Sequence, residues 1–257
     1  ERDRLAGELR EHGLRLGTVN AAGNLLHPDP GRRGDAQARL RAAVDLAAAL
    51  GVTRVVTMSG CPAGPAGGSL GVFPCWATSC DDERLFSWQL EHEVGPFWSS
   101  TSKWLAKEAP EVMVCLEMHP GVTIFSTAGF QALAADLGTN VGINFDPSHF
   151  WWQGIDPLSV IEALGHRIGW AHGKDTLLHP ERIRRQGVLH FAPPVDPELA
   201  PWHFAPVGEG HDDATWAALL RALRAAGYDD VISIEHEDPR YDGVEGTERS
   251  LAGLRRA

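Results

Sequence analysis

The sequence lacks any run of 18 or more apolar residues, the length that a helix needs to cross a membrane. It also shows no segment typical of a signal peptide, although its first residue is Glu1. Its four cysteines, Cys61, Cys75, Cys80 and Cys115, are too few for a disulfide scaffold, and none belongs to a C-x-x-C pair. We therefore expect a cytoplasmic protein with reduced thiols and no membrane association.

Basic residues are scarce as well. The chain has 23 Lys and Arg against 34 Asp and Glu, which gives a net charge of −11. Its densest basic group, Arg182, Arg184 and Arg185, has the pattern of a solvated helix or loop face. An acidic surface repels phosphate backbones, so nucleic acid is not expected as a partner. The sequence also lacks internal repeats, low-complexity tails and Ser/Gly linkers, so we predict a single domain over residues 1–257.

Short apolar or β-branched segments, bounded by Gly, Pro or Asn, recur along the chain and predict strands buried on both faces. They are Leu14–Val19, Arg54–Met58, Val112–Leu116, Val141–Phe145, Ile168–Ala171 and Val231–Ile234. Helical spacing of apolar residues lies between them, from Leu40 to Leu50 and from Trp216 to Ala226, with Gly51 and Gly227 as stops. Strands that alternate with helices predict an α/β fold with a parallel sheet.

Four of these strands are followed at their carboxyl ends by a residue that can bind a metal: Glu117, Asp146, His172 and Glu235. The first three lie 29 and then 26 residues apart, about one βα unit each, and the last follows after 63 residues. An open sheet would spread four strand ends over roughly 15 Å, at about 4.8 Å per strand. A closed barrel brings them together, so we predict a (β/α)8 TIM barrel with its site at the carboxyl ends of the strands.

Eight strands make a complete barrel, and six are found. Because residues 1–12 have the pattern of the end of a helix, we expect the first two βα units to be missing from this sequence. The alternative is that weak strands are overlooked, for example at 202–207. Two long segments rich in Gly or Pro, residues 60–96 and 176–210, follow strands and are expected to form loops on the active-site face.

Three carboxylates and one imidazole form a hard donor set, which suits Mn²⁺ first, with Mg²⁺, Co²⁺ or Zn²⁺ as alternatives. Three buried carboxylates at one point would repel one another strongly without a cation. Each residue alone has a structural interpretation, since Asp146 could cap a helix and His172 could be a hydrogen-bonded core histidine. All four at strand ends favour the metal site, with Glu117, Asp146, His172 and Glu235 as ligands.

These segments resemble those of the xylose-isomerase-like TIM barrels, the sugar (phosphate) isomerase/epimerase family, which itself resembles the endonuclease IV fold. The resemblance runs from Leu14 to Glu237. It includes the order Glu, Asp, His, Glu of the ligands, the Asp-x-x-His pattern at Asp146 and His149, and the segments Gly208–Gly210 and Gly227–Asp229. It implies the same barrel, a divalent metal, and strands five to eight as the source of the ligands.

The resemblance also implies a chemistry. In this family the metal binds the carbonyl and adjacent hydroxyl of a keto-sugar and stabilises the enediolate that forms when a carbon-bound proton leaves. In its epimerases the two metal-bound glutamates move that proton, and Glu117 and Glu235 occupy their positions. We therefore expect a metal-dependent sugar isomerase/epimerase with Glu117 and Glu235 as catalytic residues.

Three further polar residues are candidates for the site. His119 follows Glu117 by two residues and would face the same side if the strand continued, as a base or a substrate partner; otherwise it is a turn residue before Pro120. His149 could bind substrate or orient a ligand. Lys174 could neutralise an enediolate or a phosphate, or form a salt bridge with Asp175 or Glu209.

Tryptophan is frequent, with nine residues in the chain. Seven lie in or beside the segments at the strand ends: Trp76, Trp88, Trp98, Trp104, Trp151, Trp152 and Trp202. Aromatic faces stack on sugar rings or flat aglycones, so Trp76 and Trp152 are expected to bind substrate together with His149 and Lys174. Packing within the core or a lid is the alternative for each of them.

The sequence departs from the sugar epimerases after the histidine strand, where they commonly carry a substrate-binding arginine and this chain has Lys174-Asp175-Thr176. The segment from Asp146 to Pro157 also resembles the catalytic subunit of C-glycoside deglycosidases, lyases that cleave 3-keto-glycosides and work with a small β-rich partner subunit. That lyase and an inosose dehydratase are alternative functions. A homo-oligomer is the expected assembly otherwise.

Two other classes are disfavoured. An endonuclease IV-like repair enzyme needs more His and Asp ligands and a basic groove, which the net charge of −11 argues against. A non-catalytic sugar-binding protein would bind its ligand without metal and would show no turnover for Glu235→Gln to change.

Overall fold

The computed structural model describes residues 2–65, 67–69, 71, 85–189, 196 and 198–257. The chain divides into two compact units, Glu1–Asn144 and Phe145–Ala257, and the boundary falls inside one strand, β4. The prediction of a single domain stays a prediction. None of the helices in the described ranges is long and apolar enough to cross a membrane.

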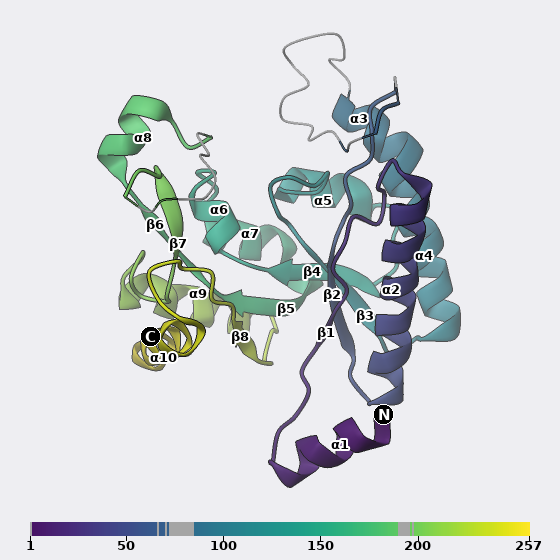
Figure 1. The fold of residues 1–257 in the computed structure, drawn as a ribbon, viewed down its shortest axis with the longest axis horizontal. Coiled ribbons are helices and arrows are strands. Elements are labelled where there is room, and N and C mark those ends of the chain that lie inside the picture. The colour runs from purple at the N-terminus through teal and green to yellow at the C-terminus, as the bar shows by residue number, and fades with distance from the viewer. Residues whose placement is uncertain (1, 66, 70, 72–84, 190–195, 197) are drawn as a thin grey trace. The chain divides into compact units, whose positions relative to one another are not determined.

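The N-terminal unit alternates helices with parallel strands (Figure 1). Its elements are α1 (Arg2–Glu11), β1 (Val19–Asn20), α2 (Pro30–Ala49), β2 (Arg54–Met58), α3 (Leu85–Gln89), the π-helix η2 (Leu90–Val94), α4 (Gly95–Glu108), β3 (Met113–Glu117), α5 (Thr127–Ala134) and β4 (Val141–Phe145). Its strands lie in the order β1-β2-β3-β4, each parallel to the next. The register places Glu117 opposite Asn144.

The C-terminal unit holds a second parallel pair, β5 with β8, and a separate antiparallel pair, β6 with β7. Its elements are α6 (Ser148–Trp151), α7 (Pro157–Leu164), the 3-10 helix η3 (Gly165–Arg167), β5 (Ile168–Gly173), β6 (Asp175–Leu178), α8 (Pro180–Gln186), β7 (Trp202–Ala205), α9 (Asp213–Ala225), β8 (Ile232–Ile234) and α10 (Gly243–Arg256). Helix α9 packs against α7 and α10, and α10 also contacts β8.

Local signals in the sequence explain the two helices that were predicted. In α2 the side chain of Asp29 accepts a hydrogen bond from the backbone N–H of Arg32 (2.9 Å), and Pro30 occupies the first turn. In α9 Asp212 caps the N–H of Thr215 (2.8 Å). Both stop signals are confirmed, because Gly51 and Gly227 have φ of 69° and 95°, a conformation that favours glycine.

All six predicted strands are present, and the bounds of Arg54–Met58 and Val141–Phe145 are confirmed. Only Val19–Asn20 pairs in the first of them, so the prediction of a strand from Leu14 was too long. The weak strand suspected at 202–207 exists as β7, but it pairs antiparallel with β6, with Asp175 opposite Ala205, and does not join the parallel sheet. Most of this hairpin lies in the segment 176–210, which we expected to be a loop with a weak strand at 202–207 as the alternative.

Candidate metal centre

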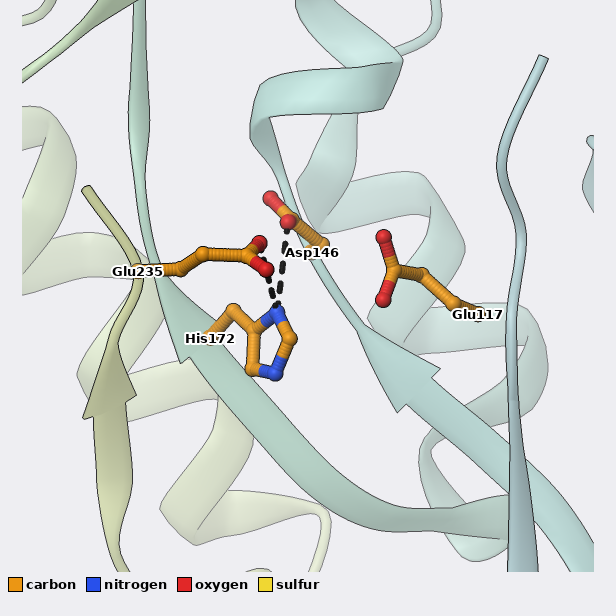
Figure 2. A group of neighbouring side chains, drawn as sticks. All are labelled: Glu117, Asp146, His172 and Glu235. Atoms are coloured by element: carbon orange, nitrogen blue, oxygen red, sulfur yellow. Dashed lines mark ion pairs between the residues drawn. The ribbon is translucent and has the colours of Figure 1, made fainter. Parts of the chain in front are cut away.

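Three of the predicted metal ligands are residues of the C-terminal unit, and each lies in or directly after the last residues of a strand (Figure 2). Asp146 directly follows β4, His172 is the fifth residue of β5, and Glu235 directly follows β8. Strands β5 and β8 are parallel, with His172 opposite Ser233, so the side chains of His172 and Glu235 emerge at the same end of the pair. Asp146 is 1% exposed and Glu235 35%.

The carboxylate of Asp146 is fixed through one oxygen. Its Oδ1 accepts hydrogen bonds from the backbone N–H of Ser148 (3.0 Å) and from its hydroxyl (2.7 Å), at the start of α6. Its Oδ2 is buried and accepts no hydrogen bond from the described residues. That oxygen faces Nζ of Lys174 at 3.1 Å and Nδ1 of His172 at 3.4 Å, so it points into a cluster of charged groups.

His172 lies between two carboxylates. Its Nδ1 is 3.4 Å from Oδ2 of Asp146 and 3.2 Å from Oε2 of Glu235, the two contacts drawn as dashed lines in Figure 2. One ring nitrogen and two carboxylate oxygens from three separate strand ends thus converge in this unit. This convergence is what the sequence predicted for these three residues.

Lys174 is buried among the same groups. Its Nζ contacts Oδ2 of Asp146 (3.1 Å), Oε2 of Glu235 (2.5 Å) and Oε2 of Glu237 (2.9 Å), and it lies 4.5 Å above the ring centre of Phe204 in β7. The side chain is 2% exposed. Buried ammonium groups are rare unless they are paired, and here the pairing is with carboxylates.

The charges in this cluster shift the pKa of two carboxyl groups downward. Burial opposes ionisation of Asp146, but the attraction of Lys174, His149 and His172 outweighs it and lowers the pKa well below the usual value. Burial also opposes ionisation of Glu235, whereas the hydrogen bond from His172 and the charge of Lys174 lower its pKa to about 2. Both groups are therefore carboxylates at neutral pH, the form that binds cations.

Glu117, the fourth predicted ligand, belongs to the N-terminal unit. It is the last residue of β3 and is buried. Its Oε2 accepts a hydrogen bond from Nδ2 of Asn144 (3.1 Å), its register partner in β4. The hydrogen bond holds the carboxylate at the carboxyl end of the strand, where the sequence placed it; Figure 2 draws it with the other three.

The other candidate residues, His149, His119 and Trp152, have surroundings that differ from one another. His149 is buried in α6, with Nε2 3.6 Å from Oδ2 of Asp146 and its ring edge-on to Phe204. His119 lies beyond the end of β3 in a turn, where its backbone N–H bonds to the carbonyl of Glu117, so the condition of a continuing strand is not met. Trp152 is buried and stacks on Trp202, with ring centres 4.5 Å apart.

Some predicted residues lie outside the described ranges: Trp76, Cys75 and Cys80. The other two cysteines, Cys61 and Cys115, are buried free thiols. Burial raises the pKa of Cys61 to about 11 and that of Cys115 to about 12. Both thiols are therefore protonated at neutral pH, and the protonated form is a poor nucleophile.

Sequence reasoning overlooked two residues of the cluster, Glu237 and Phe204. Glu237 could have been found, since it follows Glu235 by two residues and alternation in an extended segment places both on one side. Phe204 could not, because it lies in a segment expected to be a loop or a weak strand of the barrel, and the antiparallel pairing of β6 with β7 that brings its ring to Lys174 was not predicted.

Comparison with known proteins gives matches over nearly the whole chain. The family model described as xylose isomerase-like TIM barrel matches residues 1–257. The uncharacterized protein YfiH of Bacillus subtilis (strain 168) is 28% identical over 261 residues, which cover 99% of this chain and 82% of that protein.

Solved structures share the fold at lower identity. The 3-keto-D-glucoside 4-epimerase YcjR from E. coli is 17% identical with a TM-score of 0.67, covering 100% of this chain and 84% of that one. The IOLI protein with a binding zinc atom is 21% identical with a TM-score of 0.66 and coverage of 100% and 80%. A Mycobacterium smegmatis protein in complex with magnesium is 16% identical with a TM-score of 0.64 and coverage of 99% and 76%.

Proposed function

Because this chain belongs to the xylose isomerase-like TIM barrel family, we propose that it is a divalent-metal-dependent enzyme that removes a proton next to the carbonyl of a keto-sugar. Isomerisation or epimerisation is the proposed outcome. The observation that carries the proposal is the convergence of Asp146, His172 and Glu235 at strand ends, with Oδ2 of Asp146 buried and without a hydrogen bond from the described residues. A carboxylate oxygen in that position is suited to a cation.

The donor set fits such a cation. In our proposal one ligand atom from each of Glu117, Asp146, His172 and Glu235 holds the metal ion. Three oxygens and one nitrogen favour Mn²⁺, with Mg²⁺, Co²⁺ and Zn²⁺ as alternatives. Among structures of the same fold, one holds zinc and another magnesium, so the fold accommodates more than one divalent ion.

A divalent cation supplies polarisation of a carbonyl and stabilises negative charge on its oxygen. The residues of the chain supply the remainder. In our proposal the carboxylates of Glu117 and Glu235 remove and return the carbon-bound proton. The ionised state of Glu235, held by His172 and Lys174, is the state a base requires.

The surrounding residues have supporting roles in this proposal. His149, close to Oδ2 of Asp146, orients that carboxylate and offers a hydrogen bond to substrate, while Lys174 attracts negative charge that develops on the substrate. Trp152 forms part of an aromatic wall through its stacking on Trp202. His119 and Trp76 remain candidates for substrate contact.

Hydrogen exchange tests the proposal without knowledge of the final product. We would incubate the Mn²⁺-loaded protein in D2O with D-fructose and with 3-keto-glucosides, and detect deuterium at the carbon next to the carbonyl by NMR. The proposal predicts incorporation that stops when the metal is removed and falls at least about 100-fold in Glu235→Gln. Glu181→Gln, which changes an exposed carboxylate paired with Arg184, is the matched control.

The products of the same incubation identify the reaction. Conversion to a stereoisomer or an aldose supports the epimerase or isomerase, whereas release of an aglycone would assign the elimination chemistry of the lyase alternative. Absence of metal-dependent exchange with all of these substrates, or full exchange in Glu235→Gln, would contradict the proposal.

A further inference from the structure

Glu237 is a carboxylate in the cluster that the proposed chemistry does not use. It follows Glu235 by two residues, and its Oε2 accepts a hydrogen bond from Nζ of Lys174 at 2.9 Å. Its side chain is 49% exposed, whereas that of Lys174 is 2% exposed. Of the carboxylates that pair with this buried ammonium, Glu237 is therefore the one most exposed to solvent.

The ammonium of Lys174 lies among carboxylates and an aromatic ring. It donates hydrogen bonds to Glu235 and Glu237, Oδ2 of Asp146 lies 3.1 Å from it as an ion-pair partner, and the ring centre of Phe204 is 4.5 Å away. A substrate group that takes a hydrogen bond from Lys174 would compete with these partners. Glu237 is the most exposed of the three, so it is the partner that a ligand would replace.

The balance of charge in this cluster disfavours an anionic ligand. The carboxylates of Asp146, Glu235 and Glu237 surround one ammonium, and the proposed ligand Glu117 adds a fourth negative charge. With a divalent cation bound, the balance is one negative charge. No positive charge is then left over to attract a phosphate or a carboxylate of a substrate. Without Glu237 the same cluster would be neutral, and the buried ammonium of Lys174 would no longer face an excess of negative charge.

We propose that Glu237 restricts the site to uncharged keto-sugars and keto-glycosides, because it holds the ammonium of Lys174 that a sugar phosphate or sugar acid would otherwise bind. Glu237 acts through Lys174 and is a specificity-determining residue. This inference rests on the proposed function, since the divalent cation is part of the charge balance.

The test uses sulfate as an anionic probe on the Mn²⁺-loaded protein, with ionic strength held constant by NaCl and binding followed by calorimetry. We expect Glu237→Gln to bind sulfate at least about tenfold more tightly than wild type, because two like charges a few ångströms apart near a protein surface repel by more than that factor. Glu248→Gln removes the same charge from the exposed face of α10 and is the matched control.

A double variant locates the effect. Glu237→Gln combined with Lys174→Met should lose the gain in sulfate affinity, whereas binding at a distant site would persist. Two results would overturn the inference: Glu237→Gln binds sulfate no better than Glu248→Gln, or wild type already binds it at Lys174. Mn²⁺ binding is measured first on each variant, so a failure of the metal site is recognised separately from a failure of the charge selection.

Discussion

Asp175 provides the sharpest stability prediction, because its buried carboxylate joins two segments far apart in the sequence. Its Oδ2 accepts hydrogen bonds from the backbone N–H groups of Gly208 (3.0 Å), Gly210 (3.2 Å) and His211 (3.0 Å) and from Nε1 of Trp216 (2.9 Å). Its Oδ1 contacts the N–H of its neighbour Thr176 (2.7 Å) and Nδ1 of His211 (2.7 Å). The side chain is fully buried. It therefore holds the turn after β7 against the start of β6.

The substitution Asp175→Asn keeps the shape but replaces one oxygen with an NH2 group. At the Oδ2 position that group would face four N–H donors. At the Oδ1 position it would oppose the N–H of Thr176 and could donate only to Nδ1 of His211, so the second orientation costs less. Breaking a buried, charged hydrogen-bond network costs about 3–5 kcal/mol, and we expect a loss of about 3–4 kcal/mol in the free energy of unfolding.

Urea denaturation at 25 °C, followed by circular dichroism, measures this loss. The control is Asp213→Asn, which removes an exposed carboxylate paired with Arg256 at 3.0 Å and should cost less than about 1 kcal/mol. If Asp175→Asn were as stable as that control, the hydrogen bonds to Asp175 would not hold the two segments together.

Two further predictions concern the same unit. Burial, together with the charge of Arg240, lowers the pKa of His203 to about 4, so the unfolded chain binds its proton first as pH falls below about 6.5. Stability should then decrease between pH 6.5 and 4 by about 2–3 kcal/mol more in wild type than in His203→Gln, and equal pH dependence would contradict this. A Cβ at Gly246 would overlap the ring of His236, so Gly246→Ala should cost about 1–3 kcal/mol in a thermal melt. Gly243→Ala is the control in the same helix, since its Cβ meets no described heavy atom within 4 Å, and equal costs for both would refute the argument.

The strands and the residues at their ends could be predicted because the signals are local. A short β-branched segment such as Val141–Phe145 is bounded by breakers in the sequence itself, and Asp146 follows it directly. Parallel strands place their carboxyl ends together, so the neighbours of Asp146 follow from topology alone. His172 and Glu235 were located by the same reasoning.

The partners of Lys174 could not be predicted, because they depend on pairings distant in sequence. Lys174 was expected to pair with Asp175 or Glu209 or to face the substrate. Its contacts include Asp146 and Glu237, which we did not predict, while the carboxylate of Asp175 accepts hydrogen bonds from the backbone of residues 208–211. The β6–β7 hairpin was missed for a related reason, since its flanking prolines suggested a loop and its antiparallel pairing has no local signal.

The aromatic residues show a further limit of sequence reasoning. Trp152 was expected to bind substrate, with packing in the core or a lid as the alternative, and its ring is buried and stacks on Trp202. Composition indicates that aromatic side chains are abundant around the strand ends, yet it does not distinguish a ring that faces a ligand from one that packs against its neighbour.

Metal affinity tests the central claim most directly. Titration of the metal-stripped protein with Mn²⁺, followed by calorimetry, should show one ion bound per chain. Asp146→Asn should weaken that binding at least about 100-fold, because it removes a charged ligand whose Oδ2 has no hydrogen bond from the described residues. If the wild-type protein binds no divalent ion, or if Asp146→Asn binds it as tightly, then the convergence of Asp146, His172 and Glu235 is not a metal centre.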